Sequence, residues 1–253
     1  MKTLKDIATA RLLNQHLLRP LFTAPQEVVS WMGAMQAQDF SMCRWAVGVR
    51  MRKPSEAGVI EALNKGDIIR SHLNRSTWQL VTKEDYHWMM PLHRERSIRS
   101  WCAFAKQSGN PISDKMMDNS RELLTNILGG KKHLTREDII PFYQEIDIDN
   151  AHTVRHLLAV AEAEGIIHNG CTDGRKITYR LYGKDENKFG CLPKEEALAR
   201  LATKYFQSHP RHTRRFCMVE RITGERMPHR NGTDILCADR KNDKRYGIFP
   251  ARE

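Results

Sequence analysis

The stretch that decides the fold is residues 113–181, SDKMMDNSRELLTNILGGKKHLTREDIIPFYQEIDIDNAHTVRHLLAVAEAEGIIHNGCTDGRKITYRL. Its apolar residues recur at helical spacing in three runs. Ser113 is expected to cap the first helix, and Thr135, with Asp138 three residues later, the second. The third helix runs from about residue 152 to residue 164 and ends at a glycine. The stretch therefore predicts three short helices in succession.

Two strand-like runs, 166–169 and 175–181, follow the third helix, with Asp173-Gly174 in the turn between them. A short connector, His133-Leu134, separates the first two helices. Helix, short strand, helix, helix, hairpin is the order of a winged helix, whose third helix usually reads the major groove. Because some winged helices bind only protein, this order does not by itself establish DNA binding.

The first hundred residues predict a looser copy of the same order. Its first helix, about 6–18, has Leu13 and Leu17 facing inward, and Thr23 is expected to cap the second. The five tryptophans are more typical of core residues than of stacking platforms. The remaining predicted elements are helices at about 41–51 and 55–64, strands at 68–73 and 77–81, and a long helix at about 84–105.

We therefore predict an α+β fold, mostly α with small β-hairpins, built from tandem winged-helix modules. The first predicted domain is residues 1–105, which carry a Gln-x-Gln motif, and the second is residues 106–192. Residues 193–208 are predicted to form the first helix of an incomplete third module. Residues 209–253 show no clear period and are predicted to be a disordered tail.

The charge favours a polyanionic partner. The formal net charge is +11, and nucleic acid is the commonest polyanion, although a basic surface can also serve solubility. No apolar run approaches the roughly 20 residues of a membrane helix, and the start of the chain lacks a secretory pattern. We therefore expect a cytoplasmic, nucleoid-associated protein without a membrane partner. The sequence carries no signal for an oligomeric state.

The six cysteines form no CxxC pair and no zinc-like Cys/His spacing. Free thiols in a reducing compartment are the simplest interpretation. The sequence contains no metal-binding or nucleotide-binding motif, so no metal and no cofactor are expected.

Two segments resemble the AlkZ/YcaQ-like DNA glycosylases: residues 31–39, WMGAMQAQD, and residues 70–81, RSHLNRSTWQLV. The first is similar to the family's Gln-apolar-Gln signature and the second to its Arg-x-His-x-x-Arg-x-Thr hairpin, and the likeness extends to about Ser208. It implies a tandem winged-helix protein that hydrolyses the N-glycosidic bond of N7-alkylated purines, including interstrand crosslinks, in damaged double-stranded DNA. The family's catalytic motif falls on Gln36 and Gln38, whereas Gln79 stands where the family pattern has a histidine.

The implied chemistry suits glutamine. An N7-alkylated guanine is already a good leaving group, so the enzyme mainly needs a positioned water and support for an oxocarbenium-like sugar. A glutamine oxygen can accept a hydrogen bond from that water. Residues two apart diverge by about 200° on a helix but share a side in an extended segment. Gln36 and Gln38 therefore converge only if the helix breaks near Gln36.

Each candidate has a simpler alternative. Without the resemblance, the two glutamines would be expected to bond backbone ends at a helix junction. Asp39 could polarise the water, but we favour a cap on the following helix. His72 and Thr77 could be cross-strand partners, and Arg70 and Arg75 could be solvated. The predicted DNA-binding residues are Arg70, His72, Asn74, Arg75 and Thr77 in the hairpin, and Arg155, Lys176 and Arg180 in the second module.

The tail from about residue 209 is predicted to be an out-of-frame read. Dropping one base within Arg215 to Ile222 permits Asp-Phe-Ala-Trp-Trp-Ser-Gly-Leu, in which the codon across Met218 and Val219 is forced to be Trp. That octapeptide resembles what the family carries after the segment matching Tyr205 to His209. The expected consequence is an incomplete DNA channel in a truncated chain, which leaves two alternatives: a glycosylase that still acts, or one inactivated by the truncation. The alternatives to a glycosylase are a non-enzymatic DNA-binding transcription regulator and a protein-interaction module.

Overall fold

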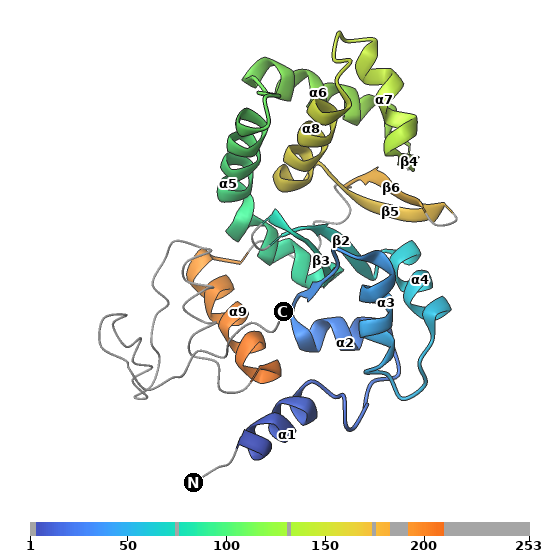
Figure 1. Cartoon of the computed structure of the whole chain (residues 1–253), viewed down its shortest axis with the longest axis vertical. Coiled ribbons are helices and arrows are strands. Elements are labelled where there is room, and N and C mark those ends of the chain that lie inside the picture. Colours follow the sequence, from blue (N-terminus) through green and yellow to red (C-terminus); the bar gives the residue numbers. More distant parts are fainter. Residues whose placement is uncertain (1–3, 74–75, 131–132, 174–175, 183–191, 210–253) are drawn as a thin grey trace, which may run out of the picture.

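A computed structural model describes residues 4–73, 76–130, 133–173, 176–182 and 192–209 (Figure 1). The chain is mostly helical, with two small three-stranded antiparallel sheets, which confirms the predicted α+β class. The predicted tail falls outside the described residues from residue 210 onward. The predicted domain boundaries stay predictions.

The same order of elements occurs twice. We call the first set module 1: α2 (Pro25–Met32), β1 (Met35–Gln36), α3 (Phe40–Gly48), α4 (Glu56–Lys65), β2 (Ile68–His72) and β3 (Trp78–Thr82). Module 2 comprises α6 (Asp114–Ile127), β4 (Leu134–Thr135), α7 (Arg136–Gln144), α8 (Ala151–Glu164), β5 (Ile167–Asp173) and β6 (Lys176–Leu181). The strand orders, β1-β3-β2 and β4-β6-β5, correspond as well. Each module has the helix, strand, helix, helix, hairpin order predicted from residues 113–181.

Local signals explain most helix starts. The Ser113 side chain accepts the Met116 N–H, and Thr135 and Asp138 form the predicted capping box. The cap predicted at Thr23 is wrong: α2 begins after Ala24, which has no side-chain acceptor. The carboxylate of Glu27 instead accepts the N–H groups of Thr23 and Ala24, at 2.9 and 3.0 Å.

The described residues form three further helices outside the two modules (Figure 1). The long α5 (Lys83–Gln107) leaves the hairpin of module 1 and packs along α8 of module 2. The α9 helix (Lys194–Ser208) packs against α2 and α5. The α1 helix (Leu4–Asn14) precedes module 1 and is not part of its repeated order. Leu13, predicted to face inward, is 37% exposed.

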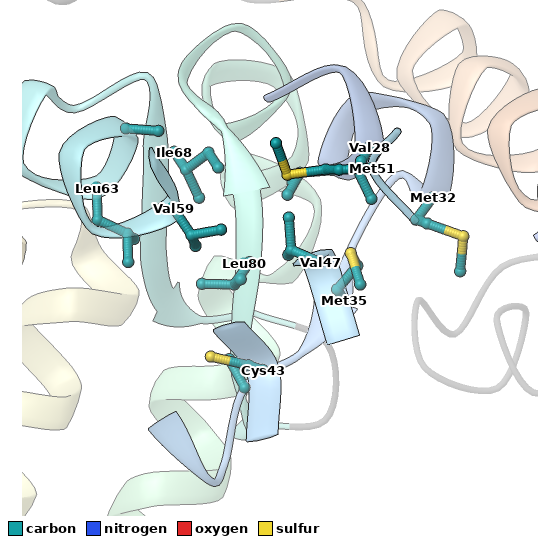
Figure 2. Close-up of a cluster of buried hydrophobic side chains, with 13 residues drawn as sticks. Val28, Met32, Met35, Cys43, Val47, Met51, Val59, Leu63, Ile68 and Leu80 are labelled. Atoms are coloured by element: carbon teal, nitrogen blue, oxygen red, sulfur yellow. The ribbon is translucent and has the colours of Figure 1, made fainter. Parts of the chain in front are cut away.

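Each module has a core of its own. Figure 2 shows the core of module 1, to which α2 contributes Val28 and Met32, α3 Val47, α4 Val59 and β3 Leu80. Full burial of one such aliphatic side chain contributes about 1.5–3 kcal/mol to stability. The prediction that the tryptophans belong to the core is wrong for Trp45 on α3, which is 62% exposed.

The hairpin of module 2 lies against module 1, beside α4 and β2. The Asn64 side chain accepts the Thr172 N–H at 3.0 Å. Arg180 packs onto Gly66, whose φ of +81° ends α4, so closely that a Cβ there would lie 2.9 Å from the guanidinium. The two modules are therefore joined by specific contacts as well as by α5.

Among the described residues, no helix is long and apolar enough to cross a membrane. Cys43, Cys102 and Cys171 are free thiols.

Candidate active site

The Gln-x-Gln segment is extended, and we call residues 35–38, of which the first two form β1, the Gln-x-Gln strand. Helix α2 ends at Met32, Gly33 turns the chain with a φ of +78°, and β1 then covers Met35 and Gln36. Met35 and Ala37 are buried, whereas Gln36, Gln38 and Asp39 are exposed. Successive side chains of an extended segment point to opposite sides, so the two glutamines share one side. The chain thus breaks its helix before Gln36, as convergence of the pair requires.

The peptide groups between the two glutamines are fixed on both sides. The Ala37 N–H donates to the Trp78 carbonyl at 2.8 Å, and the Ala37 carbonyl accepts from Nε of Arg70 at 2.9 Å. The Gln38 Oε1 accepts the Trp78 N–H at 3.4 Å, where the β1–β3 ladder ends. That bond is long, and a carbonyl oxygen has a second lone pair, so Gln38 can still accept from water.

Gln79 lies directly opposite Gln36 in the β1–β3 register, and Ser71 lies opposite Gln79 in the β2–β3 register. Directly opposed residues of an antiparallel pair share a face, with Cβ atoms about 4.5–5.5 Å apart. Ser71 is fully buried, and its hydroxyl has no hydrogen-bond partner among the described residues. The sequence singles out Gln79 only as a departure from a pattern, because register is invisible without the paired strand.

Asp39 caps α3, and its carboxylate accepts the Met42 N–H at 2.9 Å. This confirms the favoured interpretation of the residue. The cap also starts a new helix directly after Gln38, which confines the extended segment to the two glutamines and their immediate neighbours.

Arg70 and His72 lie inside the protein, 5% and 8% exposed. The solvated alternative for Arg70 is therefore wrong. Its guanidinium stacks over the Trp78 ring, 4.0 Å from the centroid, and its NH1 donates to Oδ1 of Asn169 at 3.0 Å. Burial lowers the pKa of Arg70, and the nearby Glu162 carboxylate opposes that shift.

His72 is directly opposite Trp78 in the sheet, so Thr77 is not its cross-strand partner. The imidazole Nδ1 donates to the Glu162 carboxylate, which is 1% exposed. Contact between DNA and either Arg70 or His72 stays a prediction, and both side chains are occupied by protein partners. A carboxylate among the apolar residues 157–163 was the sequence signal that could have drawn attention to Glu162.

The other predicted DNA-binding residues are spread over both modules. Arg155 is exposed on α8, and Lys176 is exposed on β6, 3.9 Å from Glu137. Arg180 donates from Nε to Nε2 of His168 at 3.1 Å. Thr77 is partly buried beside the hairpin turn. Asn74 and Arg75 lie outside the described residues.

A cleft of about 610 Å³ lies between α2, α9 and the junction of β3 with α5. It contains none of the predicted site residues; its polar lining includes Glu27, Ser30, Asp67, Lys83, Glu84 and Lys204. In the part of the chain that the structure describes, no cluster of three or more His, Cys, Asp or Glu could hold a metal ion.

The chain is similar to DNA glycosylases both in sequence and in fold. A model of the AlkZ-like DNA glycosylases matches residues 29–213, and the chain belongs to this family. Among solved structures, it is similar to the Streptomyces sahachiroi DNA glycosylase AlkZ, with a TM-score of 0.64 and 20% sequence identity. The match covers 83% of this chain and 58% of that chain, so this chain spans less than two-thirds of its length. Comparison with curated proteins found no match.

Proposed function

We propose that this protein hydrolyses the N-glycosidic bond of N7-alkylated purines, including those in interstrand crosslinks, in double-stranded DNA. The observation that carries the proposal is the exposed pair Gln36 and Gln38 on one side of the Gln-x-Gln strand, whose central residue, Ala37, is held at both its N–H and its C=O. Such a strand can hold a water against the anomeric carbon without reorganising during the reaction.

Gln36 and Gln38 would accept hydrogen bonds from the attacking water, which fixes the direction of its lone pair. Gln79, on the same sheet face as Gln36, adds a third amide to that side. The developing positive charge on the sugar is stabilised by the partial negative charges of amide oxygens. Because the departing base is itself cationic, no strong general acid is needed.

DNA would be held by cationic side chains of module 2, with Arg155 on the helix that corresponds to the major-groove reader. Replacing a single phosphate contact weakens binding to all sequences about equally and reduces the salt slope by about 1. We expect this behaviour of Arg155→Ala and of Lys176→Ala. A dissociation constant that does not change with salt would favour the protein-interaction alternative.

The deciding experiment measures base release from a duplex that contains one N7-methylguanine. Gln36→Ala and Gln38→Ala should each lower the single-turnover rate by at least ~10-fold with little change in DNA affinity, because they remove contacts to the reacting water. Gln144→Ala, an exposed glutamine at the end of α7, is the matched control and should keep the full rate.

A version with the reading frame restored after residue 208 is assayed in parallel, because we also propose that the segment beyond is out of frame. If the restored protein is folded and binds DNA but releases no base, the transcription-regulator alternative is favoured. If the nucleotide sequence shows an early stop in the shifted frame, the out-of-frame proposal is wrong.

A further inference from the structure

A buried chain of hydrogen bonds connects the Gln-x-Gln strand to module 2. Arg70 donates from Nε to the Ala37 carbonyl at 2.9 Å and from NH1 to Oδ1 of Asn169, on β5, at 3.0 Å. Asn169 in turn donates from Nδ2 to Oε1 of Glu162, on α8, at 3.4 Å. The other oxygen of Glu162 accepts from His72. The chain therefore leaves module 1 at Arg70, passes through two residues of module 2 and returns at His72.

All four side chains are buried: Arg70 is 5%, Asn169 7%, Glu162 1% and His72 8% exposed. A buried charge that loses one hydrogen-bond partner is costly, so each member restricts the others. The planar guanidinium has a fixed fork geometry, and the Trp78 ring lies against it. An acceptor at Asn169 therefore sets where Nε points, and Nε sets the position of the Ala37 carbonyl.

We propose that Asn169 and Glu162 are positioning residues for the Gln36–Gln38 strand, acting through Arg70, so that catalytic geometry in module 1 depends on the docking of module 2. The proposal rests on the glycosylase function proposed above. It assigns Arg70 to the support of the strand, with the guanidinium directed at Ala37 and Asn169. Module 2 then contributes to catalysis as well as to DNA binding.

The structure offers a matched control for the test. Asn64 also joins the modules, through the Thr172 N–H, but it has no bond to the Gln-x-Gln strand or to Arg70. Asn169→Ala removes the contact with Arg70, and Asn64→Ala removes the contacts of one side-chain oxygen with Thr172, so each variant loses polar contact between the modules. A purely structural role predicts that both variants behave alike at equal loss of thermal stability.

A paired exchange provides the rescue. In Asn169→Asp with Glu162→Gln, the new carboxylate accepts from Arg70, and the new amide donates to that carboxylate while accepting from His72. The total charge and the number of hydrogen bonds are unchanged. Asn169→Asp alone places two carboxylates next to each other with the single guanidinium as a cationic partner, so it should be worse than the pair.

Two readouts are measured on the full chain and on the frame-restored version: the single-turnover release of N7-methylguanine at saturating enzyme, and hydrogen exchange at the Ala37 amide. A misplacement of about 1 Å can cost ~100-fold in rate, so we expect Asn169→Ala to lower the rate at least ~10-fold and to speed exchange at Ala37. The paired exchange should restore both, and Asn64→Ala should change neither. If Asn169→Ala does not fold, Arg70→Lys replaces it, because an ammonium cannot bond both acceptors in the fork geometry.

The proposal is overturned if Asn169→Ala, or Arg70→Lys in its place, changes the base-release rate and the Ala37 exchange no more than Asn64→Ala does. It is also overturned if the paired exchange restores neither the rate nor the protection of Ala37. If neither the unmodified chain nor the frame-restored version releases base but Asn169→Ala selectively speeds Ala37 exchange, the glycosylase assignment fails while the coupling of module 2 to the strand stands. The exchange measurement thus separates the two failures.

Discussion

The pKa of His93, a buried histidine in α5, predicts how the stability of the protein changes with pH. The side chain is 3% exposed, and neither ring nitrogen has a hydrogen-bond partner among the described residues. Burial, with a smaller effect of Arg96, lowers the pKa of His93 from 6.5 to about 4. The folded protein therefore holds a neutral imidazole, whereas the unfolded chain takes up a proton near pH 6.5.

The sign follows from proton linkage. Below about pH 6.5, His93 is protonated in the unfolded state but stays neutral in the folded state. The free energy of unfolding therefore decreases by about 1.4 kcal/mol per pH unit until about pH 4. Between pH 7 and pH 5, protonation of His93 in the unfolded chain should therefore lower the free energy of unfolding by about 2 kcal/mol. For a chain of this size, that corresponds to roughly 4–8 °C in Tm.

The assay compares the unmodified protein with His93→Leu by urea unfolding at pH 7 and pH 5, followed by tryptophan fluorescence. His93→Leu removes the titrating group and two unpartnered polar atoms, so it should be at least as stable at pH 7 and should lose about 2 kcal/mol less on acidification. His152→Leu, at an exposed position on α8, is the control and should follow the unmodified protein. Parallel loss of stability by His93→Leu and the unmodified protein would refute the depressed pKa of His93.

Two further predictions concern residues at helix ends: Asp39, which caps α3, and Gly165, which ends α8. Asp39→Ala should destabilise the protein by about 1 kcal/mol through loss of the α3 cap, while Asp39→Ser keeps a capping oxygen and should retain both stability and the base-release rate; a large rate loss in Asp39→Ser would instead make the carboxylate part of the chemistry. Gly165→Ala should be somewhat more destabilising than Gly130→Ala in thermal unfolding. Both have a positive φ, +76° and +70°, but only at Gly165 would an added Cβ displace a neighbour, the terminal methyl of the buried Met90. Equal losses would show that backbone strain alone decides.

Local interactions made much of the fold readable in advance. The helices starting after Ser113 and Thr135 follow from caps that satisfy backbone N–H groups within three residues, and such bonds need no distant partner. Exposure was less predictable. Leu13 and Trp45 have large apolar side chains, but both are exposed to solvent. Whether another element covers such a side chain depends on tertiary packing, which the local sequence pattern does not specify.

The sequence by itself determined the element order of module 2, the family likeness and the identity of Gln36 and Gln38 as candidates, whereas it wrongly counted the helix near residues 6–18 as the start of the repeat in module 1. Only the tertiary structure decided that Gln79 lies opposite Gln36 and that Arg70 is buried against Asn169, a residue 99 positions away. These are matters of strand register and module docking. A one-residue slip in register turns every side chain to the other face, and docking brings together atoms with no local relation, so neither is encoded in any short stretch of the chain.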